Sequence, residues 1–249
     1  KIKKGDSVFL TTNLGMLGSP ITKNKNLLLV SSRWIFDSLK EIIGKKGNIF
    51  VPTYSYSFTK KKKIFNVNST KSDIGYFPNF FLKQKNIIRS RDPMMSVSGF
   101  GPNAKDILLK ISNNSYGNNC VFKRLLKLKK LKCCNIGLGY NWIPFIHHLD
   151  WVNKVSFRFN KILLGYILEK KKKKKLKWIY FARYLVKETT ADGYKIGKMA
   201  LKKNLFIFSR LANSVIYVIN YRNFFKFAKK ITKKNKWLTV TGPEFKNLR

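Results

Sequence analysis

Short apolar runs alternate with a helical pattern along the first part of the chain, and this alternation limits the fold more than any other feature. Ser7 to Leu10 has the pattern of a short buried strand, and Asn48 to Val51 has the pattern of a second one. Between them, apolar residues recur at helical spacing from Ser32 to Ile43, with Ser31 or Ser32 as the cap and Gly44 at the stop. Strand, helix and strand in this order predict an α/β layer.

Further elements continue the pattern. Pro102 has the position expected at the start of a helix over 104–111, and a second helix is expected from Val121 to Leu128. Cys133 to Ile136 then reads as a third strand. The later apolar stretches, 178–185 and 205–219, are expected to join the core in an order that the pattern leaves open.

Polar and glycine-rich loops follow all three expected strands. These loops are Thr11 to Gly18, Thr53 to Ser55 after Pro52, and Gly137 to Pro144. In open α/β sheets, ligands usually bind in the crevice at the carboxyl ends of the strands. We therefore expect the three loops to meet at one site.

The bulk properties favour a single folded domain over residues 1–249. A chain of 249 residues with 44% hydrophobic residues can bury a substantial core. Its three cysteines are too few and too unevenly spaced for a disulfide framework or a zinc site, so we expect a reduced, cytoplasmic setting and no metal. Arg210 interrupts the most apolar late stretch, 204–221, so no membrane span is expected.

The formal net charge of +41 has two interpretations. It can attract a polyanion such as nucleic acid, an anionic membrane or a phosphorylated cofactor. It can also follow from A/T-rich coding, although 11 acidic residues against 52 Lys and Arg leave an excess that coding alone does not explain. We expect the lysine runs 60–63 and 170–175 to form solvated loops or hairpin tips. Because no nucleic-acid-binding motif is recognisable, a basic nucleic-acid-binding protein ranks last among the alternatives.

Several blocks in a fixed order resemble the aminoglycoside 3-N-acetyltransferase family. The resemblance extends from about Gly5 to about Phe159. Its central block, Arg89-Ser90-Arg91-Asp92-Pro93-Met94-Met95-Ser96-Val97, resembles the family pattern Arg-Ser-x-His-Pro-x-His-Ser-Val. The other blocks are Gly5-Asp6 with the following strand and the turn to Gly18, Val51 to Ser55, Ser72 to Gly75, Tyr116-Gly117, Asn135 to Gly139, and His147 to Asp150.

The resemblance implies a layered α/β/α fold with a central mixed sheet. It also implies an enzyme that transfers an acetyl group from acetyl-CoA to a primary amine of an aminoglycoside or another amino sugar, without a covalent acyl-enzyme. The implied partner is a small amino sugar rather than a membrane or nucleic acid, and a nucleotide-linked sugar is as consistent with the sequence as an antibiotic. A homodimer is left open.

The chain departs from the family pattern at the catalytic base. The second His of the central pattern, which the family uses as its base, aligns with Met95, and a thioether accepts no proton at a useful pH. The first His aligns with Asp92. A catalytically impaired relative that binds CoA or a sugar is therefore the alternative to an active enzyme.

His147 is the expected replacement base. Asp150 follows three residues later, which places both on one face of a helix, where the carboxylate can orient the imidazole. A histidine whose nitrogens bond the local backbone is the equally weighted alternative. Ser96, with nearby backbone amides, is expected to stabilise the negative oxygen of the reaction.

The resemblance also suggests binding residues. Loop residues and the start of the first helix are expected to hold the cofactor phosphates: Thr12, Asn13, Leu14, Gly15, Gly18, Ser32 and Arg33. Thr53, Tyr54 and Trp142 are expected to line the acceptor pocket, although aromatic residues beside a site are more often part of the core.

Overall fold

The computed structural model describes residues 1–169 and 172–243. Its centre is a seven-stranded mixed sheet with the strand order β4-β5-β2-β1-β6-β10-β9. Strand β1 pairs in parallel with β2 and with β6, whereas the other neighbours are antiparallel. The strands are β1 (Ser7–Thr12), β2 (Asn48–Pro52), β4 (Ile88–Arg89), β5 (Val97–Phe100), β6 (Leu131–Ile136), β9 (Phe206–Leu211) and β10 (Ser214–Asn220).

Helices cover both faces of this sheet. On one face, α1 (Leu27–Ile43) and α2 (Tyr76–Leu82) pack against alternate residues of β1, β2 and β6. On the other face lie five helices: α3 (Ala104–Leu109), α4 (Val121–Leu125), α5 (Ile146–Val152), α6 (Tyr194–Lys202) and α7 (Tyr221–Lys234). Short 3-10 turns complete the fold: η1 (Leu14–Leu17), η2 (Ser57–Thr59), η3 (Lys187–Thr189) and η4 (Lys236–Thr239). The expected layered α/β/α architecture with a mixed sheet is confirmed.

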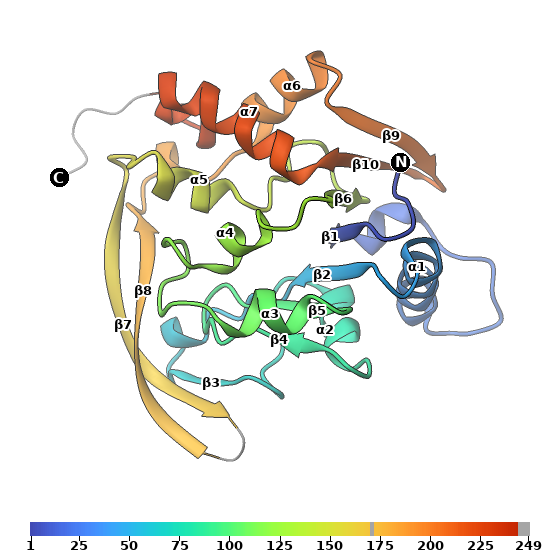
Figure 1. Ribbon diagram of the computed structural model, residues 1–249, viewed down its shortest axis with the longest axis horizontal. Helices are drawn as coiled ribbons and strands as arrows, with labels where there is room; N and C mark the ends of the chain where they lie inside the picture. The colour runs from blue at the N-terminus through green and yellow to red at the C-terminus, as the bar shows by residue number, and fades with distance from the viewer. Residues whose placement is uncertain (170–171, 244–249) are drawn as a thin grey trace.

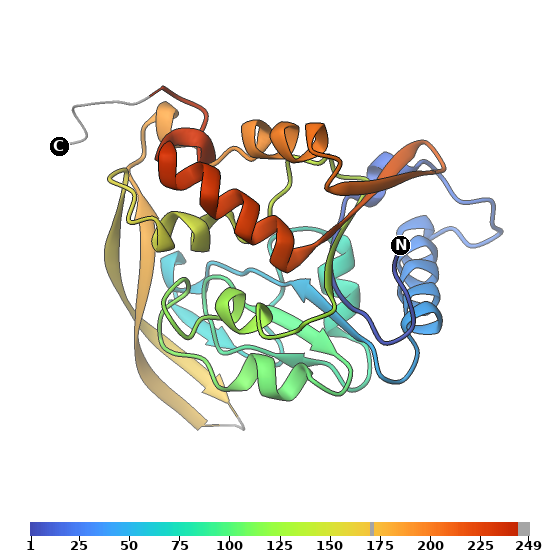
Figure 2. The ribbon, with the colours of Figure 1, turned by 45° about the horizontal axis from the view of Figure 1, so that its top comes forward.

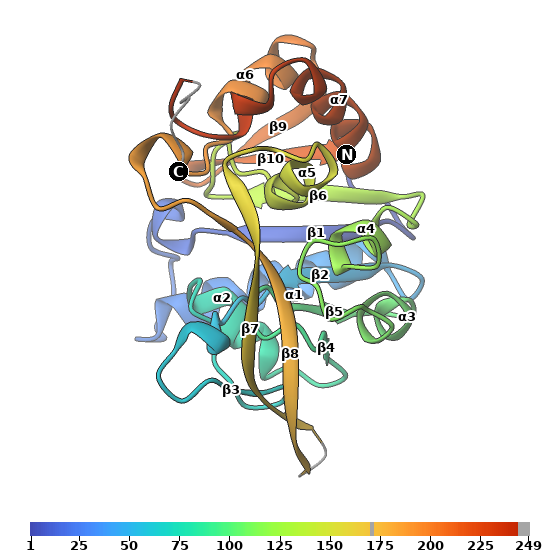
Figure 3. The ribbon, with the colours of Figure 1, turned by 90° about the vertical axis from the view of Figure 1, so that its left-hand side faces the viewer.

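A second sheet of three strands lies on the opposite side of the molecule from α1 (Figure 1). Its order is β3-β7-β8, with β3 (Ile64–Asn66), β7 (Arg158–Glu169) and β8 (Lys172–Arg183). The β7–β8 hairpin forms a long ribbon that faces the viewer in Figure 3. Trp178 of β8 is fully buried in the main core cluster, so the ribbon is anchored to the larger sheet.

The first helix begins five residues earlier than the sequence pattern predicts. Helix α1 starts at Leu27, where the side chain of Asn26 caps the first turn by accepting a hydrogen bond from the Leu29 amide at 3.0 Å. The expected caps Ser31 and Ser32 are therefore interior residues of α1. Its end is as predicted, because the chain leaves the helix at Gly44 with a φ of 63°.

Two other helix boundaries differ from expectation. Helix α3 begins at Ala104 with Asn103 at the cap, so Pro102 lies outside it, and α4 ends at Leu125 rather than Leu128. Lysines 172–175 are exposed beside the end of the β7–β8 hairpin, in agreement with the expected hairpin tip, although their backbone is already paired in strand β8. The Lys173 ammonium lies 4.4 Å from the ring centre of Tyr166. Lys170 and Lys171 lie outside the described residues. None of the described helices has the length and apolar character needed to cross a bilayer.

Candidate functional site

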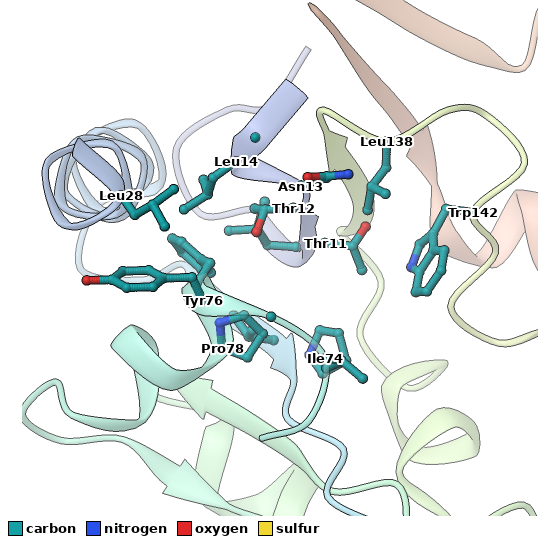
Figure 4. A pocket seen from close by; sticks show the side chains of 16 residues that line it. Thr11, Thr12, Asn13, Leu14, Leu28, Ile74, Tyr76, Pro78, Leu138 and Trp142 are labelled. Carbon is teal, nitrogen blue, oxygen red and sulfur yellow. The ribbon is translucent and has the colours of Figure 1, made fainter. Parts of the chain in front are cut away.

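A cavity of about 410 Å³ lies at the carboxyl ends of the parallel strands β1, β2 and β6 (Figure 4). The strand order brings these ends together. The loops after β1 and β6 reach the cavity, as predicted, whereas the expected loop Thr53 to Ser55 after β2 is buried and does not line it. Its walls come from five segments of the chain: Leu10–Gly15, Leu28, Val51–Pro52, Ile74–Pro78, and Leu138 with Trp142. Three predicted strands thus contribute to one cavity.

A hydrogen-bond network holds the loop that follows β6 in place. The Thr11 hydroxyl donates to the Asn135 side-chain oxygen at 2.7 Å, and the Asn135 amide donates to the carbonyls of Gly139 and Trp142. Gly137 has a φ of +69°, and an added Cβ would lie 2.2 Å from the carbonyl oxygen of Asn13. Only glycine fits at this position. The network fixes Trp142, which is 42% exposed, on the wall of the cavity.

The amino-terminal end of α1 reaches the rim of the cavity. Leu28 is a lining residue, and the Tyr76 hydroxyl donates to the Asn26 side-chain oxygen at 3.3 Å. The first turn of α1 carries no acidic residue, and the exposed Lys23 and Lys25 precede it. Free amides and the helix dipole make such a terminus attractive to anions.

The cavity wall carries no formal charge. Its lining residues include neither a carboxylate nor a cationic side chain. The nearest acidic residue in sequence is Asp73, which precedes the lining residue Ile74 and is paired with the Lys60 ammonium at 2.7 Å. The wall therefore offers apolar contact with a few amide and hydroxyl groups, and no anionic partner for a polycation.

A buried ion pair lies beside the predicted catalytic residues on α5. Arg158, the first residue of β7, donates from Nε to Asp150 Oδ2 at 2.7 Å and from Nη2 to His147 Nδ1 at 2.7 Å. Asp150 is fully buried and Arg158 is 6% exposed, whereas His147 is half-buried. His147 and Asp150 share a helix, as predicted, but the guanidinium lies between them and the carboxylate does not orient the imidazole directly.

The guanidinium also determines how His147 is protonated. Burial, together with the charges of Arg158 and Arg183, lowers the pKa of His147 well below its ordinary value, so the ring is neutral at pH 7. Because Nδ1 accepts the hydrogen bond from Arg158, the ring hydrogen is on Nε2. This contact occupies the nitrogen that a general base would use, and it leaves an N–H donor on the other side of the ring. For Asp150, burial raises the pKa to about 6, more than Arg158 lowers it.

His148 is a packed core histidine. Its Nδ1–H donates to the Tyr116 carbonyl at 2.8 Å, and its ring stacks against Trp151 and Phe225. Burial lowers its pKa to about 4. The Cys120 sulfur lies 3.5 Å from the same Nδ1, and burial raises the pKa of its thiol to about 12, so Cys120 stays protonated and unreactive.

The predicted cofactor residues separate into two groups. Thr12, Asn13, Leu14 and Gly15 line the cavity. The other three do not: Gly18 lies against Asn213, Ser32 is fully buried in α1, and Arg33 is exposed in the second turn of the same helix. Since α1 starts at Leu27, neither Ser32 nor Arg33 lies at the helix terminus where the sequence analysis placed the phosphates.

Ser96 and Thr53 form a buried structural network. The Ser96 hydroxyl donates to the Thr53 carbonyl at 2.7 Å and accepts from Arg89 Nε at 3.1 Å. Both residues have no exposed surface, so the Ser96 hydroxyl cannot reach a thioester. Tyr54 is 7% exposed and packs near Tyr56, with ring centres 6.4 Å apart, which makes it a core residue rather than a lining one.

Arg158, which the sequence analysis missed, contacts the predicted catalytic residues His147 and Asp150, and none of these three is among the residues that line the cavity. Its partners are eight and eleven positions away on another element, so no helical or strand periodicity relates them. The only sequence signal is an arginine where the chain mostly uses lysine, since a buried fork-shaped donor can serve two acceptors at once. Asp92 has a structural role as well: its Oδ1 accepts from the amides of Met94 and Met95 at 2.8 Å each.

The fold and the sequence both have counterparts among known proteins. The profile of the family described as aminoglycoside 3-N-acetyltransferase matches residues 27–233. No curated protein sequence matches the chain significantly.

Three solved structures show the likeness in fold. Aminoglycoside acetyltransferase AAC(3)-Xa superposes with a TM-score of 0.79 at 14% identity, over 94% of this chain and 88% of that chain. AAC-IIIb, solved as a binary complex with CoASH, gives a TM-score of 0.79 at 13% identity, over 98% of this chain and 94% of that chain. The YokD protein from Bacillus subtilis gives a TM-score of 0.76 at 14% identity, over 94% of each chain.

Proposed function

This chain belongs to the aminoglycoside 3-N-acetyltransferase family, and from this premise we propose that it transfers an acetyl group from acetyl-CoA to the primary amine of an amino sugar. The observation that carries the proposal is the cavity at the ends of β1, β2 and β6, with the start of α1 at its rim. AAC-IIIb, which has the same fold, binds CoASH.

The residues present suit acetyl-CoA. Leu10, Leu14 and Pro78 provide apolar walls for a slender, largely apolar arm, and Thr12 and Asn13 add polar groups at the end of β1. The α1 terminus, with Lys23 and Lys25 before it, provides amides and positive charge for phosphate groups. These positions replace Ser32 and Arg33 in the phosphate-binding role.

His147 is our candidate for contact with the reacting atoms, in a role that its hydrogen bonds define. Acetyl-CoA supplies a thioester that a primary amine can attack. Arg158 keeps His147 Nδ1 as an acceptor, so Nε2–H is available to donate to the oxygen that becomes negative during attack. Asp150 holds the guanidinium in position from its other side.

Among the described residues, this arrangement offers no evident side chain that can act as the base for the amine proton. Met95 replaces the histidine that the resemblance assigns to that task, and its side chain is 2% exposed. We expect the amine to attack in its neutral form, with the hydrogen that it loses ending on the sulfur of the released thiol. The enzyme is then slower at neutral pH than a relative with a histidine base, by roughly the 10²–10⁴-fold that general base catalysis contributes.

The lack of carboxylates in the cavity wall, together with the positive net charge of the chain, favours an acceptor that is neutral or anionic. The solved relative AAC-VIa binds the polycationic aminoglycoside sisomicin, but no carboxylate lines this cavity and the chain carries a net charge of +41. A polycation would meet repulsion here, whereas a nucleotide-linked amino sugar would be attracted. The exposed face of Trp142 offers a stacking surface for a sugar or a base.

The test is release of free CoA thiol from acetyl-CoA with a panel of three acceptors: sisomicin, glucosamine and a nucleotide-linked glucosamine. We expect the highest kcat/KM with the nucleotide-linked sugar. His147→Ala should lower turnover while acetyl-CoA still raises the melting temperature, because the cavity is intact. Thermal protection by acetyl-CoA without thiol release from any acceptor would instead identify a catalytically impaired relative.

A further inference from the structure

Two aromatic side chains stand at opposite ends of the cavity. Figure 4 shows Tyr76 at one end and Trp142 at the other, with Thr12 and Asn13 between them. The Tyr76 end adjoins the first turn of α1, where Leu28 lines the cavity and where the phosphates of acetyl-CoA are proposed to bind. The second substrate of the proposed reaction must therefore reach the thioester from the Trp142 end.

Trp142 differs from its neighbours in the amount of surface that it leaves open. It is 42% exposed, whereas Ile143, the next residue, is buried in the main core cluster. A half-exposed indole on a cavity wall presents a flat apolar face, with one N–H at its edge, to a molecule that enters. The face of a sugar ring, with its carbon-bound hydrogens, is complementary to such a surface.

The Asn135 side chain holds the Trp142 loop from the inside. Asn135 lies opposite Thr11 in the pairing of β6 with β1, and both side chains are buried. Asn135 Oδ1 accepts from the Thr11 hydroxyl at 2.7 Å. Its Nδ2 donates to the carbonyl of Gly139 at 3.1 Å and to the carbonyl of Trp142 itself at 3.0 Å. Each hydrogen of the amide therefore has a partner on the loop.

The loop requires an amide at position 135. In the reverse orientation, Asn135 Oδ1 would face the two carbonyl oxygens of the loop and Nδ2 would face the Thr11 hydroxyl. A carboxylate of the same size could still accept from Thr11, but its second oxygen would repel both carbonyls. Asp at this position would therefore displace the loop with almost no change in side-chain volume.

Helix α6 braces the same loop from the outside (Figure 2). An added Cβ on Gly193, the cap of α6, would lie 2.0 Å from the Asn141 carbonyl oxygen. One on Gly197 would lie 2.5 Å from the Tyr140 carbonyl oxygen. The helix can approach the loop this closely because neither residue has a side chain. The backbone that carries Trp142 is thus held on two sides.

We propose that Trp142 selects the acceptor by stacking on the ring of an amino sugar, and that Asn135 is a positioning residue that holds the indole in place. This inference rests on the acetyl transfer proposed above, and it assigns one end of the cavity to the acceptor. The residues that line the cavity carry no formal charge, so selection at this end depends on shape and apolar contact. An open-chain amine has no ring face and gains nothing from the indole.

The first test is the steady-state kinetics of thiol release with glucosamine and with ethanolamine as acceptors. Trp142→Ala should raise the KM for glucosamine roughly tenfold, because it removes a stacking contact together with the apolar area that the contact buries. The KM for ethanolamine and the KM for acetyl-CoA should not change. Trp142→Phe retains an aromatic face, so its KM for glucosamine should lie between those of the wild type and Trp142→Ala.

The second test addresses Asn135. Asn135→Asp should raise the KM for glucosamine about as much as Trp142→Ala does, while acetyl-CoA still raises the melting temperature. Thr11→Val, which lacks the hydroxyl, should act in the same direction, and Thr11→Ser, which retains it, should stay closer to the wild type. A purely structural role would weaken the binding of both substrates, so the separation of the two KM values identifies positioning.

The chain offers a matched control for each substitution. Trp34→Ala removes a tryptophan of α1 that is 52% exposed and does not line the cavity. Asn48→Asp changes another buried amide, which donates to the Ser7 hydroxyl at 2.9 Å at the amino-terminal end of β1 and β2, away from the cavity. Both controls should keep the wild-type KM for glucosamine, although Asn48→Asp should lower the melting temperature.

Tryptophan emission tests the contact without catalysis. Titration with glucosamine, free or nucleotide-linked, should change the emission of the wild type and of Trp34→Phe, but not that of Trp142→Phe. Unchanged KM for glucosamine in Trp142→Ala, with thiol release intact, would overturn the inference and leave the acetyl transfer in place. If the wild type releases thiol with no acceptor, the proposed function fails, and an emission change that requires Trp142 would still support sugar binding at this end. Absence of that emission change would overturn the inference as well.

Discussion

Arg158 and His147 are joined by a hydrogen bond of 2.7 Å in which the guanidinium donates to Nδ1 of the imidazole. An arginine in this position cannot accept a proton, so the bond fixes the neutral ring with its hydrogen on Nε2. The same guanidinium neutralises a carboxylate that has no exposed surface, Asp150. The Arg158 guanidinium therefore stabilises the fold through Asp150 and orients a candidate reactive group, His147.

Replacing Arg158 by Met should destabilise the fold by about 3–5 kcal/mol, because it leaves Asp150 buried without its partner. The double variant Arg158→Met/Asp150→Asn should recover a large part of this loss, since no buried charge remains. Equilibrium unfolding in urea measures both. Equal destabilisation in the single and double variants would show that lost packing, rather than the unpaired charge, dominates.

Two substitutions of His147 distinguish a hydrogen-bond donor from a general base. Gln places an N–H near the position of Nε2–H and cannot act as a base, so His147→Gln should keep much more activity than His147→Ala if His147 donates. In the wild type, kcat/KM should keep rising with pH toward the pKa of the acceptor amine, without a plateau near pH 7. A plateau at neutral pH, with both variants equally inactive, would identify His147 as the base.

The strands and the meeting of the loops after β1 and β6 followed from the sequence, because buried parallel strands are short apolar runs and their polar ends emerge at one edge. The loop Thr53 to Ser55 was expected there as well and is buried instead. The start of α1 did not. Leu27 to Val30 extend the helix towards Asn26, and Ser31 and Ser32 have the residue type of a cap without its position. The cavity residues Thr12 to Gly15 were predictable for the same reason as the strands.

The polar contacts of the site were harder to predict. Ser96 and Thr53 stand at strand ends, as ligand-binding hydroxyls often do, but each finds a partner in the neighbouring strand and becomes fully buried. Lysines 172–175 lie at the expected hairpin tip, but cross-strand pairing with β7 extends to Lys172, which their composition does not indicate. Such outcomes depend on contacts between elements, which local patterns do not encode.

Gly137→Ala adds only one methyl group, but it should disturb the cavity strongly. The residue has a φ of +69°, and the added Cβ would lie 2.2 Å from the Asn13 backbone oxygen, which is on the cavity wall. Backbone must move, so we expect a loss of roughly 2–3 kcal/mol in unfolding free energy and weaker thermal protection by acetyl-CoA. Gly5→Ala is the matched control, because its φ is +81° but nothing lies within 4 Å of the added atom. Equal thermal protection of the two variants by acetyl-CoA would show that the loop at Asn13 does not contribute to cofactor binding.

His148 should make the protein sensitive to acid. Burial lowers its pKa to about 4 in the fold, whereas the unfolded chain titrates near 6.5, so the unfolded state binds the proton more readily between these values. The stability that His148 contributes is therefore complete above pH 6.5 and is lost as the pH falls through about 4, by roughly 3 kcal/mol. Asp92 and Asp150, whose pKa values burial raises to about 6, change stability in the opposite direction, since the fold binds their protons more readily.

The measurement is therefore the difference in unfolding free energy between wild type and His148→Asn, whose amide can still donate to the Tyr116 carbonyl. We expect the variant to be less stable at pH 7, because it loses stacking on Trp151 and Phe225, and the difference to narrow or reverse by pH 4. A difference that stays constant from pH 7 to pH 4 would mean that His148 takes up no proton on unfolding, and the acid sensitivity would then have to come from His147.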